Sequence, residues 1–214
     1  FKSRILIGAD GTSSRVAKPA LGNGHPTTPL LQAVVGLPSG WRAGTTQVWF
    51  EPDDTPYFYW MIPQSPTHAA IGFIAEEGKS ARSKLERFLV RIGFKAVEIQ
   101  SARIPCYSHS VQPWRRISGC EVYLVGDAAA QVKVTTVGGL VTGLRGAKAA
   151  ASAILGRSDY ARELRSLRRE LSLHLLIRTA LNRFQGADYD RLLDLLNEDA
   201  IHLLGRYNRD RAAS

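Results

Sequence analysis

The sequence predicts a mixed fold, α+β or α/β, in which an antiparallel sheet is flanked by strand-to-helix units. From Gln32 to Glu76, short runs rich in β-forming residues alternate with proline-containing turns, as is typical of an antiparallel sheet. On either side, at Phe1–Arg15 and Val122–Leu155, an apolar run ends in glycine and aspartate and leads toward a helical pattern. These two observations together predict the fold class.

The amino-terminal elements follow in order. Phe1–Ile7 is expected to be a strand, and Ser13 or Ser14 can cap a short helix that Pro19 limits. A loop is expected over Gly22–Pro29. Four strands are then expected in the sheet: Leu30–Leu37, Thr45–Glu51, Tyr57–Ile62 and His68–Ala75.

The remaining elements are predominantly helical. The apolar residues of Ser80–Gly93 recur at helical spacing, and Val97–Pro105 reads as a strand. Trp114–Gly119 is expected to turn into a buried strand at Glu121–Val125. Three helical stretches complete the prediction, the second forming one long helix or two: Leu140–Leu155, Tyr160–Phe184 and Tyr189–Leu204.

Charge and composition narrow the function classes. The chain has 214 residues and a formal net charge of +9, which suggests nucleic acid, anionic lipid, a phosphorylated ligand or simply a basic surface. Nucleic acid is disfavoured because the arginine-rich segment Arg157–Arg183 lacks the series of aromatic side chains on which bases stack. Four of its arginines could instead contact anionic lipid or form a solvated basic face: Arg162, Arg165, Arg168 and Arg169.

Cysteine and histidine usage argues against a metal site. Cys106 and Cys120 have no C-x-x-C spacing, and the five histidines form no ligand pair. No apolar run reaches the roughly 18 residues that span a bilayer. The sequence is therefore expected to belong to a cytoplasmic protein, with peripheral membrane contact as an open alternative.

The first strand-to-helix unit can bind an anion or a hydroxyl group. Gly8 and Gly11 flank Asp10, so the backbone can turn sharply and approach a ligand closely. The Asp10 carboxylate can accept hydrogen bonds from hydroxyls or nearby backbone amides, and Arg15 can pair with a phosphate. A plain strand-to-helix turn is the alternative interpretation.

The second unit combines more features of a nucleotide site. Asp127 follows the strand and can hold a ribityl hydroxyl, while Gly138 and Gly139 permit close contact with a flat ring. The helix that begins at Leu140 then offers backbone N–H groups and the positive end of its dipole to a negative group, such as the N1–O2 region of a reduced flavin. The alternative is a structural turn before a tightly packed helix.

These strings resemble known flavoproteins. Gly8-Ala9-Asp10-Gly11 with Arg15 looks like the DG motif of flavoproteins with the p-hydroxybenzoate hydroxylase fold, and Gly126-Asp127-Ala128-Ala129 resembles their second FAD motif. The longer string GDAAAQVKVTTVGG, from Gly126 to Gly139, is similar to the geranylgeranyl reductase family, as is YFYWMIP from Tyr57 to Pro63 followed by Ile71-Gly72-Phe73. Three residues depart from that family's usual proline, glycine and phenylalanine, respectively: Val134, Val137 and Ile62.

The resemblance implies the C-terminal part of an FAD-binding p-hydroxybenzoate hydroxylase-like fold, with the N-terminal dinucleotide-binding part missing from this chain and expected to complete the FAD site. It implies FAD-domain segments at 1–29 and 106–156. Between them, 30–105 would be an antiparallel substrate domain with one helix, and 157–214 a helical region. The implied FAD-binding residues are Asp10, Gly11, Arg15, Gly126, Asp127, Ala128, Lys133, Thr136, Gly138, Gly139 and Leu140.

The implied reaction is reduction of carbon–carbon double bonds in a polyprenyl or similar lipid, with NAD(P)H or another reductant as the electron donor. The expected substrate-binding residues are Tyr57, Tyr59, Trp60, Pro63 and Gly72, some of which must belong to the sheet core by strand alternation. Candidate proton donors are Tyr59, Cys106 and Tyr107.

Three other interpretations stay open. The same FAD motifs serve aromatic monooxygenases and halogenases. A membrane-associated dehydrogenase that reduces a quinone is less favoured, because no Fe–S cysteine cluster is present. The chain could also be a non-catalytic remnant that binds no flavin alone.

Overall fold

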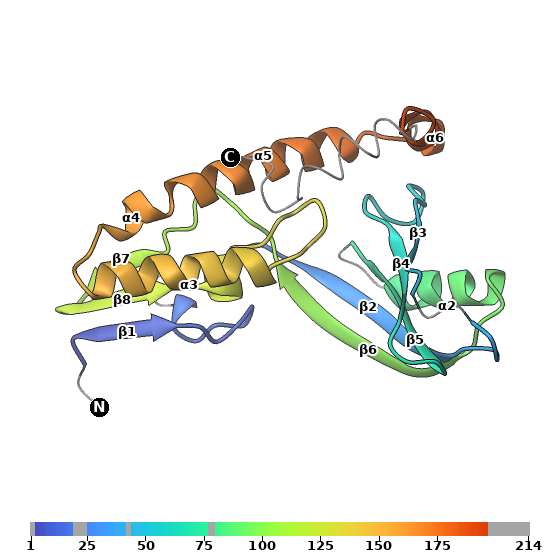
Figure 1. Ribbon diagram of the computed structural model, residues 1–214, viewed down its shortest axis with the longest axis horizontal. Coiled ribbons are helices and arrows are strands. Elements are labelled where there is room, and N and C mark those ends of the chain that lie inside the picture. Colours follow the sequence, from blue (N-terminus) through green and yellow to red (C-terminus); the bar gives the residue numbers. More distant parts are fainter. Residues whose placement is uncertain (1–2, 19–24, 42–43, 77–79, 197–214) are drawn as a thin grey trace. The chain divides into compact units, whose positions relative to one another are not determined.

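The computed structural model describes residues 3–18, 25–41, 44–76 and 80–196 (Figure 1). The chain forms two compact units. Unit 1 comprises Phe1–Thr27, Ile104–Ala180 and Leu196–Ser214, as far as these are described, and unit 2 comprises Thr28–Arg103 and Leu181–Leu195. Each unit has its own sheet and its own apolar core.

Unit 1 is built on a three-stranded sheet in the order β1-β8-β7: Ile5–Gly8, Cys120–Leu124 and Trp114–Ile117. β1 pairs with β8 in parallel, with Gly8 opposite Leu124. β7 pairs with β8 in the antiparallel direction, so the segment expected only as a turn is itself a strand. The reason is the two-residue connection Ser118-Gly119, whose φ angles of 48° and 83° suit a tight hairpin.

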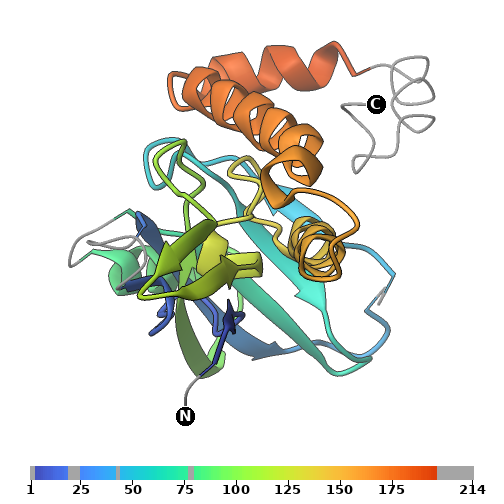
Figure 2. The ribbon, with the colours of Figure 1, turned by 90° about the vertical axis from the view of Figure 1, so that its left-hand side faces the viewer.

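The helices of unit 1 follow β8: the short 3₁₀ helix η1 (Gly126–Ala129), α3 (Leu140–Ile154), α4 (Tyr160–Glu163) and α5 (Arg165–Leu181). Because side chains alternate along a strand, Tyr123 and Val125 pack with helix residues such as Ala150, while Leu124 packs with Ala129 on the other face. Figure 1 shows α3 running along the sheet with α5 farther from β1, and Figure 2 shows α3 end-on. The small side chains of the alanines in α3 let this helix pack closely against the core.

Unit 2 contains a five-stranded sheet in the order β3-β4-β5-β2-β6: Gln47–Trp49, Tyr59–Pro63, His68–Ile74, Thr27–Gly36 and Ala96–Pro105. β3 with β4, β4 with β5, and β5 with β2 are antiparallel pairs, which confirms the predicted antiparallel sheet. The helix α2 (Ala81–Arg91) buries Leu85, Phe88 and Leu89 against one face of it, at the helical spacing read from the sequence.

The last described helix, α6 (Gly186–Asp194), belongs to unit 2. It begins three residues before the expected Tyr189 because Gln185 and Asp188 form a capping box. Tyr189 is buried and stacks on Phe50, with ring centroids 4.4 Å apart. The predicted continuation to Leu204 lies outside the described residues beyond 196.

Three further observations refine the predictions. β2 begins at Thr27, so the expected loop over Gly22–Pro29 ends earlier, and its first residues lie outside the described part. The Ser14 hydroxyl accepts a hydrogen bond from the backbone N–H of Ala17, as an N-cap does, and Ala17 and Lys18 are helical. The expected stretch from Tyr160 to Phe184 consists of two helices, α4 and α5, which meet at Leu164.

Across the described ranges, no helix combines the length and apolarity needed to cross a bilayer. The same residues contain no group of three or more His, Cys, Asp or Glu side chains that could hold a metal ion.

Candidate functional site

The structure brings the two glycine–aspartate turns together. Because β1 and β8 are adjacent parallel strands, the turns that follow them leave the same edge of the sheet. The backbone N–H of Val125 donates to the carbonyl of Gly8 at 2.9 Å, and the Thr12 hydroxyl donates to Asp127 Oδ2 at 3.4 Å. The carboxyl edge of parallel strands is where α/β proteins bind nucleotides, so this edge is the candidate site.

Asp127 stands at the centre of this edge. It lies in η1, immediately after the strand, and is half-buried. A Cβ atom on Gly139 would stand 3.0 Å from Asp127 Oδ1, so the diglycine bend approaches the carboxylate closely because it carries no side chain. The Asp127 carbonyl accepts a hydrogen bond of 2.9 Å from His25 Nε2, a contact that the sequence spacing does not indicate.

Asp10 has a different role from Asp127. Its carboxylate accepts hydrogen bonds from the Ser14 hydroxyl and from the backbone N–H groups of Arg15, at 2.7 Å, and Val16, at 3.4 Å. The slight desolvation of Asp10 acts to raise its pKa, but these hydrogen bonds outweigh it and hold the pKa below the ordinary 3.8. Asp10 therefore shapes its own turn, and that turn presents the exposed Arg15.

Gln131 links the second turn to α3, and sequence reasoning missed it. Its side-chain Oε1 accepts a hydrogen bond of 2.8 Å from the Gly126 N–H, and its backbone carbonyl accepts one from the Thr142 hydroxyl. Gly146 leaves the room that this buried amide occupies, because a Cβ there would overlap the Gln131 side chain. The glycine one helical turn after Thr142 was the only signal, and it reads equally well as a packing feature.

The segment between Gln131 and α3 folds into a tight turn. The Lys133 N–H donates to the Gly138 carbonyl at 3.1 Å, and the Thr136 N–H donates to the Lys133 carbonyl at 3.3 Å. Val137 lies at φ 50°, in the left-handed region that a β-branched residue seldom adopts. This is the position at which the resembling family usually has its third glycine, so the departure noted in the sequence falls on a residue with a positive φ angle.

The other predicted residues of this turn differ in exposure. Lys133 and Ala128 are buried, Thr136 is exposed, and Gly138 is half-buried. Leu140, the first residue of α3, is 79% exposed, and the N-cap residue Gly139 supplies no side-chain hydrogen bond to the helix. The amino end of α3 therefore lies beside Asp127 without a side-chain cap of its own.

The predicted substrate residues of unit 2 fall on two faces of β4. Trp60 lies over Gly72, where a Cβ would stand 2.7 Å from the indole Cζ2 atom, and Phe58 meets Trp60 edge to face at 6.3 Å between centroids. Tyr59 is on the opposite face, in the core beneath α2. Tyr57 and Pro63 are half-buried. Strand alternation thus separates Trp60 and Gly72 from Tyr59, in line with the expectation that some of these residues belong to the sheet core.

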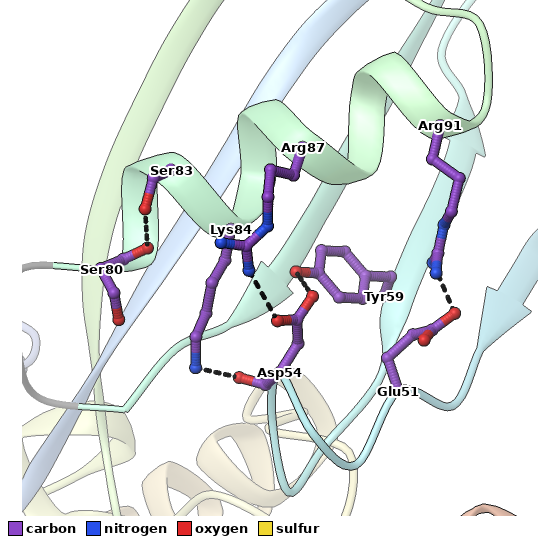
Figure 3. A network of polar contacts seen from close by, with 8 residues as sticks. All are labelled: Glu51, Asp54, Tyr59, Ser80, Ser83, Lys84, Arg87 and Arg91. Carbon is purple, nitrogen blue, oxygen red and sulfur yellow. Dashed lines mark hydrogen bonds and ion pairs between the residues drawn. The ribbon is translucent and has the colours of Figure 1, made fainter.

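Tyr59 belongs to a polar network around Asp54 that joins a turn to α2 (Figure 3). Its ring is fully buried between Phe73 and Phe88, and its hydroxyl donates to Asp54 Oδ2 at 3.1 Å. Arg87 bonds Asp54 Oδ1 at 3.2 Å and Lys84 bonds the Asp54 carbonyl at 2.7 Å. Burial first, and then the Asp54 carboxylate, raise the pKa of Tyr59. These contacts give Tyr59 a packing role, which does not suit the expected proton donor.

The other two candidate proton donors lie in unit 1. Tyr107 is buried in the core with Leu167 and Leu171, and its hydroxyl reaches the Arg168 carbonyl at 3.5 Å. Cys106 is half-buried against the same core. Like Tyr59, Tyr107 occupies a core position, so the described contacts single out neither tyrosine for proton transfer.

Comparison with known proteins bears on the fold and the family. No protein-family model matches the chain. It is 28% identical over 158 residues to digeranylgeranylglycerophospholipid reductase 1 of Methanopyrus kandleri, covering 67% of this chain and 40% of that protein. It is 27% identical over 170 residues to the geranylgeranyl diphosphate reductase of a Synechocystis species, covering 74% of this chain and 40% of that protein. The chain thus spans 40% of the length of these curated relatives.

Solved structures share the fold. A geranylgeranyl bacteriochlorophyll reductase-like protein from Thermoplasma acidophilum superposes with a TM-score of 0.71 at 17% identity, over 92% of this chain and 55% of that one. The flavin-dependent halogenase CmlS superposes with a TM-score of 0.58 at 19% identity, over 98% and 44% of the two chains. The predicted p-hydroxybenzoate hydroxylase-like fold and the resemblance to geranylgeranyl reductases are therefore confirmed.

Proposed function

We propose that this chain forms part of an FAD-dependent oxidoreductase of the geranylgeranyl reductase type, which reduces carbon–carbon double bonds of a polyprenyl or similar lipid. The observation that carries the proposal is the meeting of the Asp10 and Asp127 turns at the carboxyl edge of β1 and β8. The relatives named above are reductases of geranylgeranyl compounds, which supports the same reaction class here.

The residues at this edge fit a flavin nucleotide. Asp127 offers a partly exposed acceptor for ribityl hydroxyls, and Arg15 offers an exposed cation for phosphate. Gly138, where an added Cβ would meet only Thr136 Oγ1 at 3.5 Å, leaves the bend open to close approach by a flat ring, beside the uncapped amino end of α3. Such donors and acceptors are those that an extended, negatively charged dinucleotide requires.

When bound, FAD would supply the hydride chemistry. The protein groups would have three tasks. Asp127 would orient the ribityl chain, and the backbone of the Gly138-Gly139 bend would contact the ring. The amino end of α3 would favour negative charge near it. Hydrogen bonds from Ser14 and from the amides of Arg15 and Val16 would keep Asp10 ionised and its turn closed.

The substrate would contact the face of the unit 2 sheet that carries Trp60 and Gly72. Trp60, which is 9% exposed and lies over Gly72, meets the half-buried Phe58 edge to face there. Aromatic side chains suit contact with an apolar chain. The remaining length of the relatives would bring the other half of the FAD site, and NAD(P)H or another reductant would supply electrons.

A flavin titration of the purified chain tests the proposal. Bound flavin should appear as absorbance near ~450 nm, and Asp127→Ala should weaken binding at least tenfold, because it removes the acceptor nearest the bend. Asp53→Asn, which changes an exposed carboxylate of unit 2, is the matched control and should bind like the wild type. A colourless chain that binds no added FAD would favour the remnant interpretation. The titration would then be repeated after adding the part of the longer relatives that lies outside the matched region. Flavin binding by the combination would decide between the enzyme and the remnant interpretations.

A second function, oxygen-dependent halogenation or hydroxylation of an aromatic ring, is favoured by the superposition with the halogenase CmlS. Assay of the flavin-loaded protein separates the two. Anaerobic reduction of a prenyl alkene would support the reductase. Oxygen consumption that requires halide or a phenol would support the alternative.

Peripheral membrane contact is a separate proposal. The four arginines named from the sequence, Arg162, Arg165, Arg168 and Arg169, are all exposed in the structure. Vesicles that contain anionic lipid should co-sediment the wild type and lose a variant in which all four are glutamine. Equal binding of both proteins would rule out a lipid role for this face.

A further inference from the structure

Helix α5 holds the turn that leads to the diglycine bend. Val134 packs in the core of unit 1 with Leu167 and Leu171 of α5. One residue later, Thr135 Oγ1 lies 2.7 Å from His174 Nδ1. A packed valine and a hydrogen-bonded threonine therefore fasten the turn to α5 just before Val137 and the bend.

His174 belongs to a row of polar side chains along α5. Glu170, His174 and Arg178 are four residues apart, which places them on one face of the helix. Glu170 is 3% exposed and Arg178 is 5% exposed. Arg145 of α3 forms an ion pair with Glu170 Oε2. Charged side chains are seldom buried to this extent unless they are paired, as Glu170 is with Arg145.

In the part of the chain that the structure describes, His174 Nε2 and Glu170 Oε1 are among the buried side-chain atoms without a hydrogen-bond partner. The charged groups around His174 are Lys133 from the turn and Glu170 and Arg178 from its own helix, with Arg145 bonded to Glu170. An imidazolium at His174 would carry N–H groups at both ring nitrogens, of which Nε2–H has no acceptor among the described residues, and the charge of Lys133 disfavours it.

We propose that His174 is a positioning residue for the flavin site, whose neutral imidazole holds Thr135 and so fixes the Gly138-Gly139 bend, and whose protonation loosens that bend. The inference rests on the proposed function, because it assigns the bend to a flavin. It adds a pH-dependent latch in α5, which acts through Thr135 and not through contact with the cofactor.

The direction of the pH effect follows from the surroundings. Burial first, and then the charge of Lys133, lower the pKa of His174 below 6.5, while Glu170 opposes the shift. When the turn is released, His174 binds a proton with its ordinary pKa, so the released form gains protons before the docked form does. The latch is therefore at full strength above about pH 6.5 and weakens as the pH falls from there toward the lowered pKa.

Amide hydrogen exchange of the chain itself tests the latch without flavin. Thr135→Val and His174→Leu each remove one partner, and each should speed exchange in residues 131–139 about fivefold, the effect of one lost hydrogen bond. The double variant should add little to either. Thr179→Val, which changes an exposed threonine of α5 outside this contact, is the matched control and should leave exchange of 131–139 unchanged.

The pH profile separates a positioning role from packing. In the wild type, exchange of 131–139, corrected for its intrinsic rate, should accelerate between pH 7.5 and pH 5.5. In His174→Asn, whose amide keeps a polar atom near the place of Nδ1 but does not titrate, this acceleration should vanish. Unchanged exchange in Thr135→Val, or a wild-type profile that does not respond to pH, would overturn the proposal.

Flavin titration of the same variants keeps the two proposals apart. If the wild type binds FAD, Thr135→Val should weaken binding severalfold at pH 7.5, and the wild type should lose a similar factor at pH 5.5. If the wild type binds no FAD while the exchange results hold, the proposed function fails for this chain, but the latch stands.

Discussion

The two units use aspartate in opposite ways. In unit 1, Asp127 is half-buried at a strand end, and glycine leaves space beside it. In unit 2, Asp54 is surrounded by Tyr59, Arg87 and Lys84 and ties a turn to α2. The residue types alone do not separate these cases, since carboxylate, tyrosine and basic residues suggest chemistry in both. The difference lies in how each carboxylate is used: Asp54 is bonded by Tyr59 and Arg87, whereas Asp127 accepts a 3.4 Å hydrogen bond from Thr12 and lies against the side-chain-free Gly139.

The largest effect that would test this contrast is expected from Tyr59→Ala. The ring is fully buried between Phe73 and Phe88, so its loss leaves a cavity and should cost about 4 kcal/mol of unfolding free energy. Urea denaturation measures it. Ile62→Ala, on the same strand but 45% exposed, should cost less than about 1 kcal/mol. Similar costs for both would mean that Tyr59 is not the core residue described here.

Gly146→Ala is the corresponding test in unit 1. The added methyl group would overlap the Gln131 side chain, which bonds the Gly126 N–H. Moving that amide should cost about 2 kcal/mol by overpacking and should also weaken FAD binding, because the Asp127 turn loses its brace. Ala147→Ser, at the exposed neighbouring position, should change both quantities little. A stable Gly146→Ala protein with normal FAD binding would show that Gln131 does not set the turn.

The sequence was most informative where the relevant signal is local. The strand at β8, the helix α3 and the apolar spacing of α2 follow from periodicity within a few residues. Which partners meet across the chain does not follow. The Thr12 contact with Asp127 spans 115 positions and the His25 contact spans 102. Periodicity within a strand carries no information about such pairs, so the site could be predicted as two separate turns but not as one constellation.

The second feature that the sequence does not predict is which face of a strand is covered by a helix. Tyr59 and Trp60 are adjacent and both aromatic, and alternation guarantees only that they point to opposite sides. The choice of side depends on where α2 packs. Leu85, Phe88 and Leu89 of that helix cover the Tyr59 side, and this decides that Tyr59 belongs to the core beneath α2 while Trp60, which is 9% exposed, lies on the opposite face.

A smaller effect is expected from Tyr59→Phe, which keeps the ring and removes only the hydroxyl. The loss of the hydrogen bond to Asp54 should cost about 1.5 kcal/mol, since the acceptor is ionised. Arg87 still bonds Asp54, so the turn should stay attached to α2. Any flavin bound by unit 1 should be unaffected. A large loss of FAD binding in Tyr59→Phe would contradict the contrast between the two units, because it would give the buried tyrosine a role in the cofactor site.

The smallest effect, and the one of opposite sign, is expected from Val137→Gly. Val137 lies at φ 50°, where a β-branched residue costs about 1–2 kcal/mol more than glycine. Glycine also makes the unfolded chain more flexible, which returns about 0.5–1 kcal/mol. The net change should be a stabilisation of about 0.5 kcal/mol, measured by urea denaturation. Val134→Gly, three residues earlier, should destabilise instead, because Val134 is buried in the core that α5 covers. If both substitutions destabilise, the left-handed position of Val137 is not strained, and the glycine that the resembling family uses there would have to serve the ligand rather than the backbone.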